Sequence, residues 1–120
     1  MTNEHPDARS PLTAQEMHEH VIGLCSKHDI VWEWCKRPSQ AWSARELEQI
    51  CIAPVRSPIS YATALHEIGH ILGRHQQSRD SMTRERWAWQ WAKSNALLWT
   101  PVMERYAAKA LAFVAGRSYL

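Results

Sequence analysis

The sequence lacks a long apolar run. No stretch approaches the roughly 18 consecutive apolar residues that a membrane-spanning helix needs. The polar start from Met1 to Pro11 has no apolar segment that could act as a secretory signal. We therefore expect a soluble cytoplasmic protein without a membrane partner, and a flexible N-terminus over residues 1–11.

The chain also has only a small excess of one charge sign, and few cysteines. The chain has 14 Lys and Arg residues and 12 Asp and Glu residues, and its net charge of +2 is too small to predict a nucleic acid as partner. The three cysteines, Cys25, Cys35 and Cys51, are widely spaced and form no CxxC pair. This pattern favours free thiols in a reducing compartment over a disulfide framework.

Apolar residues recur at helical spacing in four segments of the chain. Thr13 and Glu16 have the spacing of a capping box, and Gly73 and Gly116 are placed to end helices. The first predicted helix covers residues 13–28, and the second begins at Pro58 or Ser60 and ends at Gly73. The third is capped by Asp80, Ser81 or Thr83 and runs to about Leu98. The fourth begins at Thr100-Pro101 and ends near Gly116.

Short segments rich in β-branched and aromatic residues predict strands between the first two helices. One strand is expected at residues 30–34, and residues 41–54 are expected to hold two short strands, the better one at 48–54. Strands followed by a run of helices are typical of the α+β class. We therefore expect a single metallopeptidase-like domain over residues 12–120, with a small antiparallel sheet of two to three strands packed against helices and a mostly helical C-terminal half.

The segment His66-Glu67-Ile68-Gly69-His70 matches the HExxH pattern of zinc peptidases. Helix positions four apart lie on one face, so His66 and His70 can direct ring nitrogens toward one metal ion. Glu67 lies beside that point and suits a general base that takes a proton from metal-activated water. We therefore predict His66 and His70 as zinc ligands and Glu67 as the catalytic residue.

The rest of this helix supports the assignment. At about 100° per residue the two histidines lie roughly 40° apart, and the apolar residues gather on the opposite side. These apolar residues are Tyr61, Ala64, Ile68, Ile71 and Leu72. Ala62, Gly69 and Gly73 flank the histidine face, where small residues would let another element approach closely.

A catalytic zinc usually takes a third protein ligand and leaves one position for water. The candidates are His28, His75, Asp80 and Glu85. His75 follows Gly73 after one residue, whereas the longer metzincin pattern needs two. Glu85 is favoured, because small residues on its side of the next helix would let two helices share one metal. These small residues are Ala88, Ala92 and Ala96.

His66-Glu67-Ile68-Gly69-His70, followed by Glu85-x-x-Ala88-x-x-Trp91-Ala92, resembles the ImmA/IrrE family of metallo-endopeptidases over about residues 30–95. In that family a zincin-like HExxH helix is completed by a glutamate from a later helix. The resemblance implies zinc bound by His66, His70 and Glu85, with Glu67 as general base. It also implies a regulatory protein as substrate, often a repressor of a phage or mobile element. Trp89 departs from the family pattern, which usually has Asn or Asp at this position.

Two other hypotheses remain open. A SprT-like or other HExxH peptidase would use His75 as third ligand. A non-catalytic protein-binding module would hold the metal for structure alone. It would bind its partner protein in the groove where a peptidase would hold its substrate. Of three tryptophans expected on the helix after the motif, Trp87, Trp89 and Trp91, we expect one or two in the core and one beside a substrate groove.

Overall fold

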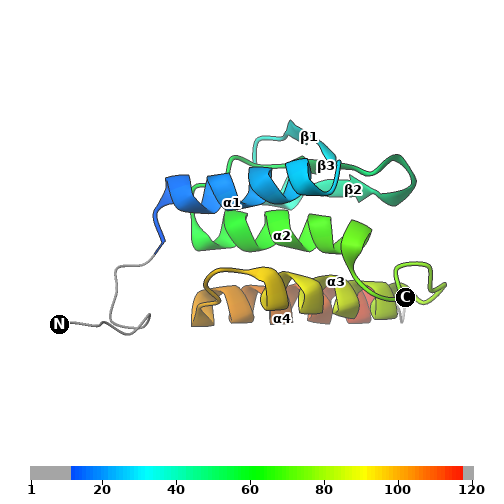
Figure 1. Ribbon diagram of the computed structural model, residues 1–120. Coiled ribbons are helices and arrows are strands. Elements are labelled where there is room, and N and C mark those ends of the chain that lie inside the picture. Colours follow the sequence, from blue (N-terminus) through cyan, green and yellow to red (C-terminus); the bar gives the residue numbers. More distant parts are fainter. Residues whose placement is uncertain (1–11, 118–120) are drawn as a thin grey trace.

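The computed structural model describes residues 12–117 of the chain (Figure 1). The helices are α1 (Ala14–Lys27), α2 (Pro58–Leu72), α3 (Ser81–Asn95) and α4 (Pro101–Arg117). The strands are β1 (Val31–Trp34), β2 (Trp42–Ala44) and β3 (Gln49–Ile52), and two short 3₁₀ turns, η2 (Pro38–Gln40) and η3 (Arg45–Leu47), flank β2. The predicted α+β class and the mostly helical C-terminal half are confirmed. The flexible segment expected at residues 1–11 lies outside the described residues.

Helix α2 lies at the centre of the fold. The sheet and α1 lie on one side of it, and α3 and α4 lie on the other (Figure 1). Because neighbours cover it on both sides, α2 is buried along most of its length, with Tyr61 and Leu65 almost inaccessible. One hydrophobic core joins α2 to Ile50 of the sheet and to Met103 of α4. The helix that carries the HExxH motif is therefore the helix that every layer contacts.

The sheet is mixed. Its strand order is β1-β3-β2, with β3 antiparallel to β2 and parallel to β1. The two short strands expected within residues 41–54 are both present. The chain reverses before β2 and again at η3, where Glu48 has a left-handed φ of 49°. After these two reversals β3 runs in the same direction as β1. Because β3 lies between β1 and β2, it pairs with β1 in parallel, which differs from the antiparallel pairing that we expected.

Local capping sets the starts of the helices. Thr13 and Glu16 form the predicted capping box of α1: each backbone N–H donates to the other side chain, at 2.8 Å and 3.0 Å. Helix α2 begins at Pro58 after the cap at Ser57, and Asp80 caps α3. These starts fall where the sequence placed them.

The end of α3 is set by a contact with α2. The helix stops at Asn95, before the expected end at Leu98, and the backbone N–H of Leu97 donates to the Tyr61 hydroxyl at 3.0 Å. The same hydroxyl lies 2.7 Å from Nδ1 of His20 in α1. One buried phenol thus ties α1, α2 and the connection between α3 and α4 together.

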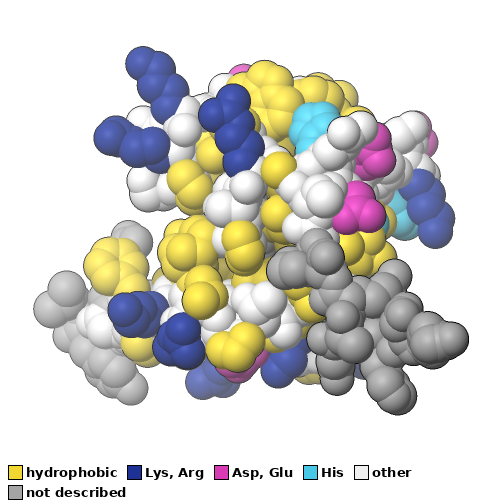
Figure 2. All heavy atoms as spheres, turned by 90° about the vertical axis from the view of Figure 1, so that its left-hand side faces the viewer, with side chains coloured by type: hydrophobic (Ala, Val, Ile, Leu, Met, Phe, Trp, Pro, Cys, Tyr) yellow, Lys and Arg dark blue, Asp and Glu magenta, His cyan; other side chains and the backbone are white. Residues whose placement is uncertain are grey.

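Large hydrophobic side chains are exposed at this end of the molecule, among them Leu97 and Leu98 of the connection and Val102 at the start of α4. Figure 2 looks at this end of the molecule and shows hydrophobic side chains on its surface, with Lys and Arg nearby. The motif histidine His70 lies toward the other end of α2 (Figure 1). Within residues 12–117, none of the helices combines the length and apolar character that crossing a bilayer requires.

Candidate metal centre

His66 and His70 lie one turn apart on α2, and Glu85 reaches both of them from α3. Nε2 of His66 is 2.9 Å from Oε1 of Glu85, and Nε2 of His70 is 2.9 Å from Oε2 of the same carboxylate. One ligand atom from each of the three residues lies within 4.8 Å of the others. This His-His-Glu cluster could bind a metal ion, and its donor set is one found in catalytic zinc sites.

Gly69 of α2 and Gly73, the C-cap of that helix, let α3 come close enough for Glu85 to reach the histidines. A β-carbon at Gly69 would clash with the carbonyl oxygen of Ala88, and one at Gly73 would lie 3.2 Å from the carbonyl oxygen of Trp87. Ala88 is itself fully buried in this contact. The prediction that small residues beside the histidine face admit another element is confirmed, and that element is the helix of Glu85.

Gln76 holds His70 by the ring nitrogen that does not face Glu85. Its Oε1 lies 2.9 Å from Nδ1 of His70. Its amide nitrogen donates to the carbonyl oxygens of Arg74 at 3.1 Å and Arg84 at 2.9 Å, which fixes the orientation of the amide. Nδ1 of His70 therefore donates to Gln76, and Nε2, which faces Glu85, is the ring nitrogen available to bind a metal ion.

The sequence pattern did not identify Gln76. Gln77 beside it has the same chemistry, but Gln77 is exposed, whereas Gln76 is buried. The preceding residue, His75, has a left-handed φ of 58° in the loop between α2 and α3. This loop conformation has no local signal in the sequence, so nothing there could have separated the two glutamines.

Glu67 is buried beside His66. Its Oε2 lies 3.4 Å from Nδ1 of His66, the ring nitrogen that does not face Glu85. A carboxylate at this place favours a proton on Nδ1 and leaves Nε2 for a metal ion. Glu67 is thus adjacent to the cluster, as the motif predicts, and in this structure it contacts the ring of His66.

The two carboxylates control protonation of the metal-free site. Burial by itself lowers the pKa of His66, but hydrogen bonds and charges from Glu67 and Glu85 outweigh burial and raise this pKa to about 9. For Glu85, burial by itself raises the pKa, whereas hydrogen bonds and charges from His66 and His70 hold it well below its usual range. At neutral pH the metal-free site therefore holds a proton on His66 between two carboxylates, where a metal cation can replace it.

The three tryptophans of α3 occupy different environments. Trp89 is buried and stacks on His66, with 4.2 Å between ring centroids and 17° between planes. Trp91 packs against the core. Trp87 lies beside the loop, with its ring centroid 4.7 Å from that of His75. Trp89 therefore supports the His66 ring by stacking on one of its faces.

The other candidate ligands lie outside the cluster. His28 is the C-cap of α1, and Asp80 accepts the backbone N–H of Met82 at 3.3 Å as the cap of α3. His75 is exposed in the loop. Among the residues that the structure describes, Glu85 is the candidate brought to His66 and His70.

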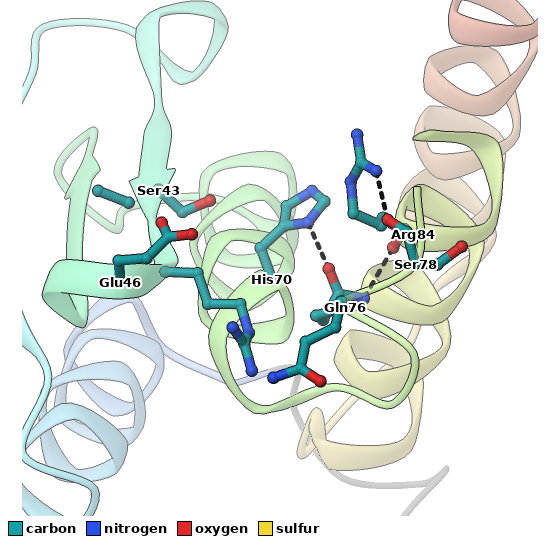
Figure 3. Close-up of a pocket in the computed structure, with 9 residues that line it drawn as sticks. Ser43, Glu46, His70, Gln76, Ser78 and Arg84 are labelled. Atoms are coloured by element: carbon teal, nitrogen blue, oxygen red, sulfur yellow. Dashed lines mark hydrogen bonds between the residues drawn. The ribbon is translucent and has the colours of Figure 1, made fainter. Parts of the chain in front are cut away.

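A polar cleft of about 580 Å³ opens beside His70. It lies between the wall formed by β2 and η3 and the wall formed by the α2–α3 loop and the start of α3. Figure 3 shows Ser43 and Glu46 on one side of His70, and Gln76, Ser78 and Arg84 on the other. A cleft of this size can hold a segment of a peptide chain next to the cluster.

Comparison with known proteins adds no relative. The chain matches no family model, no curated protein and no solved structure. The chemistry of the site therefore rests on its own residues: a His-His-Glu cluster that could hold a metal ion, a second buried carboxylate, and a polar cleft beside them.

Proposed function

We propose that the protein is a zinc-dependent metallo-endopeptidase with His66, His70 and Glu85 as metal ligands and Glu67 as general base. The observation that carries the proposal is the convergence of two imidazoles and one carboxylate beside a second buried carboxylate. Nitrogen ligands favour zinc over magnesium or calcium, which prefer oxygen. Zinc bound there would supply a Lewis acid that polarises a peptide carbonyl and lowers the pKa of water to about 7.

The chain's own groups would supply the remaining steps. Glu67 would accept a proton from the attacking water at its carboxylate and pass that proton to the departing peptide nitrogen. Gln76 would hold one ligand ring through its 2.9 Å hydrogen bond, and Trp89 would hold the other by stacking at 4.2 Å. Such support matters because a misplacement of about 1 Å can slow a reaction roughly a hundredfold.

A peptide is the substrate that the surroundings favour. Among the described strands, β2 pairs with β3 alone and so has a free edge. Ser43 and Ala44 of β2 line the cleft that leads to His70. An extended peptide can add to such an edge through main-chain hydrogen bonds.

The class of protein substrate and its compartment are further parts of the proposal. The resemblance to the ImmA/IrrE family supports a regulatory protein as substrate, such as a repressor of a phage or mobile element. Cys25, Cys35 and Cys51 are all free thiols. Free thiols support a reducing compartment such as the cytoplasm.

The test is cleavage of a quenched-fluorescent peptide library by the zinc-loaded, full-length protein. We expect cleavage that a chelator abolishes and added zinc restores. Glu67→Gln should retain zinc and cut at least about a hundredfold more slowly, because the general base is lost. An undiminished rate in Glu67→Gln would refute the role of the base, and a zinc-loaded protein that cuts no peptide would refute the peptidase.

A non-catalytic binding module is the second candidate, and one contact favours it. The 3.4 Å between Glu67 Oε2 and His66 Nδ1 is an arrangement in which a carboxylate orients a metal ligand. If that is the only role of Glu67, then Glu67→Gln should weaken zinc binding, and the wild-type protein should cleave no peptide. Zinc affinity and cleavage rate measured on the same variant separate the two candidates.

A further inference from the structure

Two arginines line the cleft beside His70. Arg45 comes from η3 and Arg84 comes from α3, so each wall of the cleft contributes a guanidinium group. Nη1 of Arg84 donates to the carbonyl oxygen of Ser78 at 2.6 Å, a contact visible in Figure 3. That bond uses one of the five donor hydrogens of Arg84 and anchors the side chain at the cleft.

Arg45 carries a donor without an acceptor. Its Nε is buried and has no hydrogen-bond partner among the described residues. A buried, unpaired donor is unfavourable. A ligand in the cleft cannot reach this buried nitrogen, so the terminal Nη groups of Arg45 are the donors that it would meet. A guanidinium presents parallel N–H groups that match the two oxygens of a carboxylate. The Arg45 guanidinium, which belongs to no ion pair among the described residues, therefore points to an anionic ligand with two oxygens.

The charge of the cleft favours the same kind of ligand. Its lining includes the two arginines and a single carboxylate, that of Glu46, which is exposed. Within residues 12–117, neither Arg45 nor Arg84 belongs to an ion pair. The positive charge of the lining is thus left for a ligand to neutralise.

We propose that this cleft is a specificity subsite that binds a carboxylate of the substrate peptide, with Arg45 as its main contact and Arg84 as the second. The inference rests on the proposed peptidase function, because the adjacent cluster makes the bound segment a substrate. The carboxylate belongs either to an Asp or Glu side chain near the scissile bond or to the C-terminus of a short peptide. Both sources present the same pair of oxygens.

The test measures binding apart from cleavage, by fluorescence anisotropy with the zinc-loaded Glu67→Gln protein. Four fluorescein-labelled alanine-serine heptapeptides serve as probes. Three are amidated and carry a central Glu, Gln or Lys, and the fourth is the Gln peptide with a free C-terminus. We expect the Glu peptide to bind about tenfold tighter than the Gln peptide, and the Lys peptide to bind weakest.

Variants of the arginine identify the contact. Arg45→Gln should remove the preference for the Glu peptide, and Arg45→Glu should reverse it toward the Lys peptide. The exposed Arg105 lies on α4, away from the cleft lining, so Arg105→Gln is a matched control that should change nothing. If the free C-terminus gains affinity over its amide and Arg45→Gln abolishes that gain, then the chain end is the ligand.

The proposal would be overturned by equal binding of all four probes, or by no binding of any probe at millimolar protein concentration. A preference that survives in a folded, zinc-loaded Arg45→Gln would also overturn it, because the metal itself would then hold the carboxylate. If Arg45→Gln does not fold, Arg84→Gln must weaken Glu-peptide binding several-fold for the proposal to stand. Preferential binding by a wild-type protein that cuts no peptide would support the subsite and refute the peptidase.

Discussion

Replacement of Gln76 by alanine should weaken zinc binding without removing a ligand. The amide accepts from Nδ1 of His70 at 2.9 Å and donates to the carbonyls of Arg74 and Arg84 at 3.1 Å and 2.9 Å. Alanine removes the acceptor that fixes the His70 ring and leaves both carbonyls without this donor. Loss of such a partner lowers metal affinity by about 10- to 100-fold, or about 1.4–2.8 kcal/mol.

Competition with a chromophoric chelator at fixed neutral pH measures this affinity. Gln77→Ala is the matched control, because Gln77 is the exposed neighbour and the hydrogen bond of His70 is made with Gln76. Gln76→Glu can still accept from His70 but cannot donate to the two carbonyls, so it should retain zinc and lower the free energy of unfolding. An unchanged zinc affinity in Gln76→Ala would refute the reasoning.

Three further predictions test the ligands, the helix contact and the charges. Metal analysis should show zinc lost from Glu85→Ala and unchanged in His75→Ala, and the reverse result would move the third ligand to His75. Gly69→Ala should lower the free energy of unfolding in urea by about 1–3 kcal/mol, because its β-carbon meets α3. Gly23→Ala, with nothing within 4 Å, should instead raise it by up to about 1 kcal/mol; a Gly69→Ala protein of wild-type stability would contradict the close contact. The folded pKa of His66, about 9, lies above the ordinary value of 6.5, so its ion pairs stabilise the metal-free fold fully below pH 6.5 and are lost as pH rises through 9. Urea unfolding should show this decline in the metal-free protein and not in His66→Gln.

Much of the fold could be predicted because its signals are local. The capping box at Thr13 and the cap at Asp80 depend on residues within one helical turn, and they place the starts of α1 and α3. The helical wheel of α2 depends only on spacing. It identified Tyr61 and Ile68 as buried, and it placed Gly69 where another helix comes close.

The features that could not be predicted depend on contacts between distant segments. The parallel pairing of β1 with β3 follows from where β3 inserts, which no single strand encodes. The end of α3 depends on the bond between Leu97 and Tyr61, which lie far apart in the sequence. Gln76 differs from Gln77 only in how the loop turns. Glu85 could be predicted in part. Small residues at helical spacing in both helices favoured it as the third ligand, but its contacts with His66 and His70 are known only from the structure.

The same contacts explain how a metal site can be assembled before the metal arrives. Packing of Gly69 against Ala88 fixes the separation of the two helices, and Gln76 and Trp89 each hold one ligand ring. None of these contacts needs a metal ion. What the metal-free site does need is a positive charge between its carboxylates, and the proton on His66, with a pKa of about 9, supplies it. Because a ligand must lose its proton to bind metal, zinc uptake should release this proton, and zinc affinity should rise with pH up to about 9. Packing thus determines where the metal would bind, and electrostatics determines the pH at which it can.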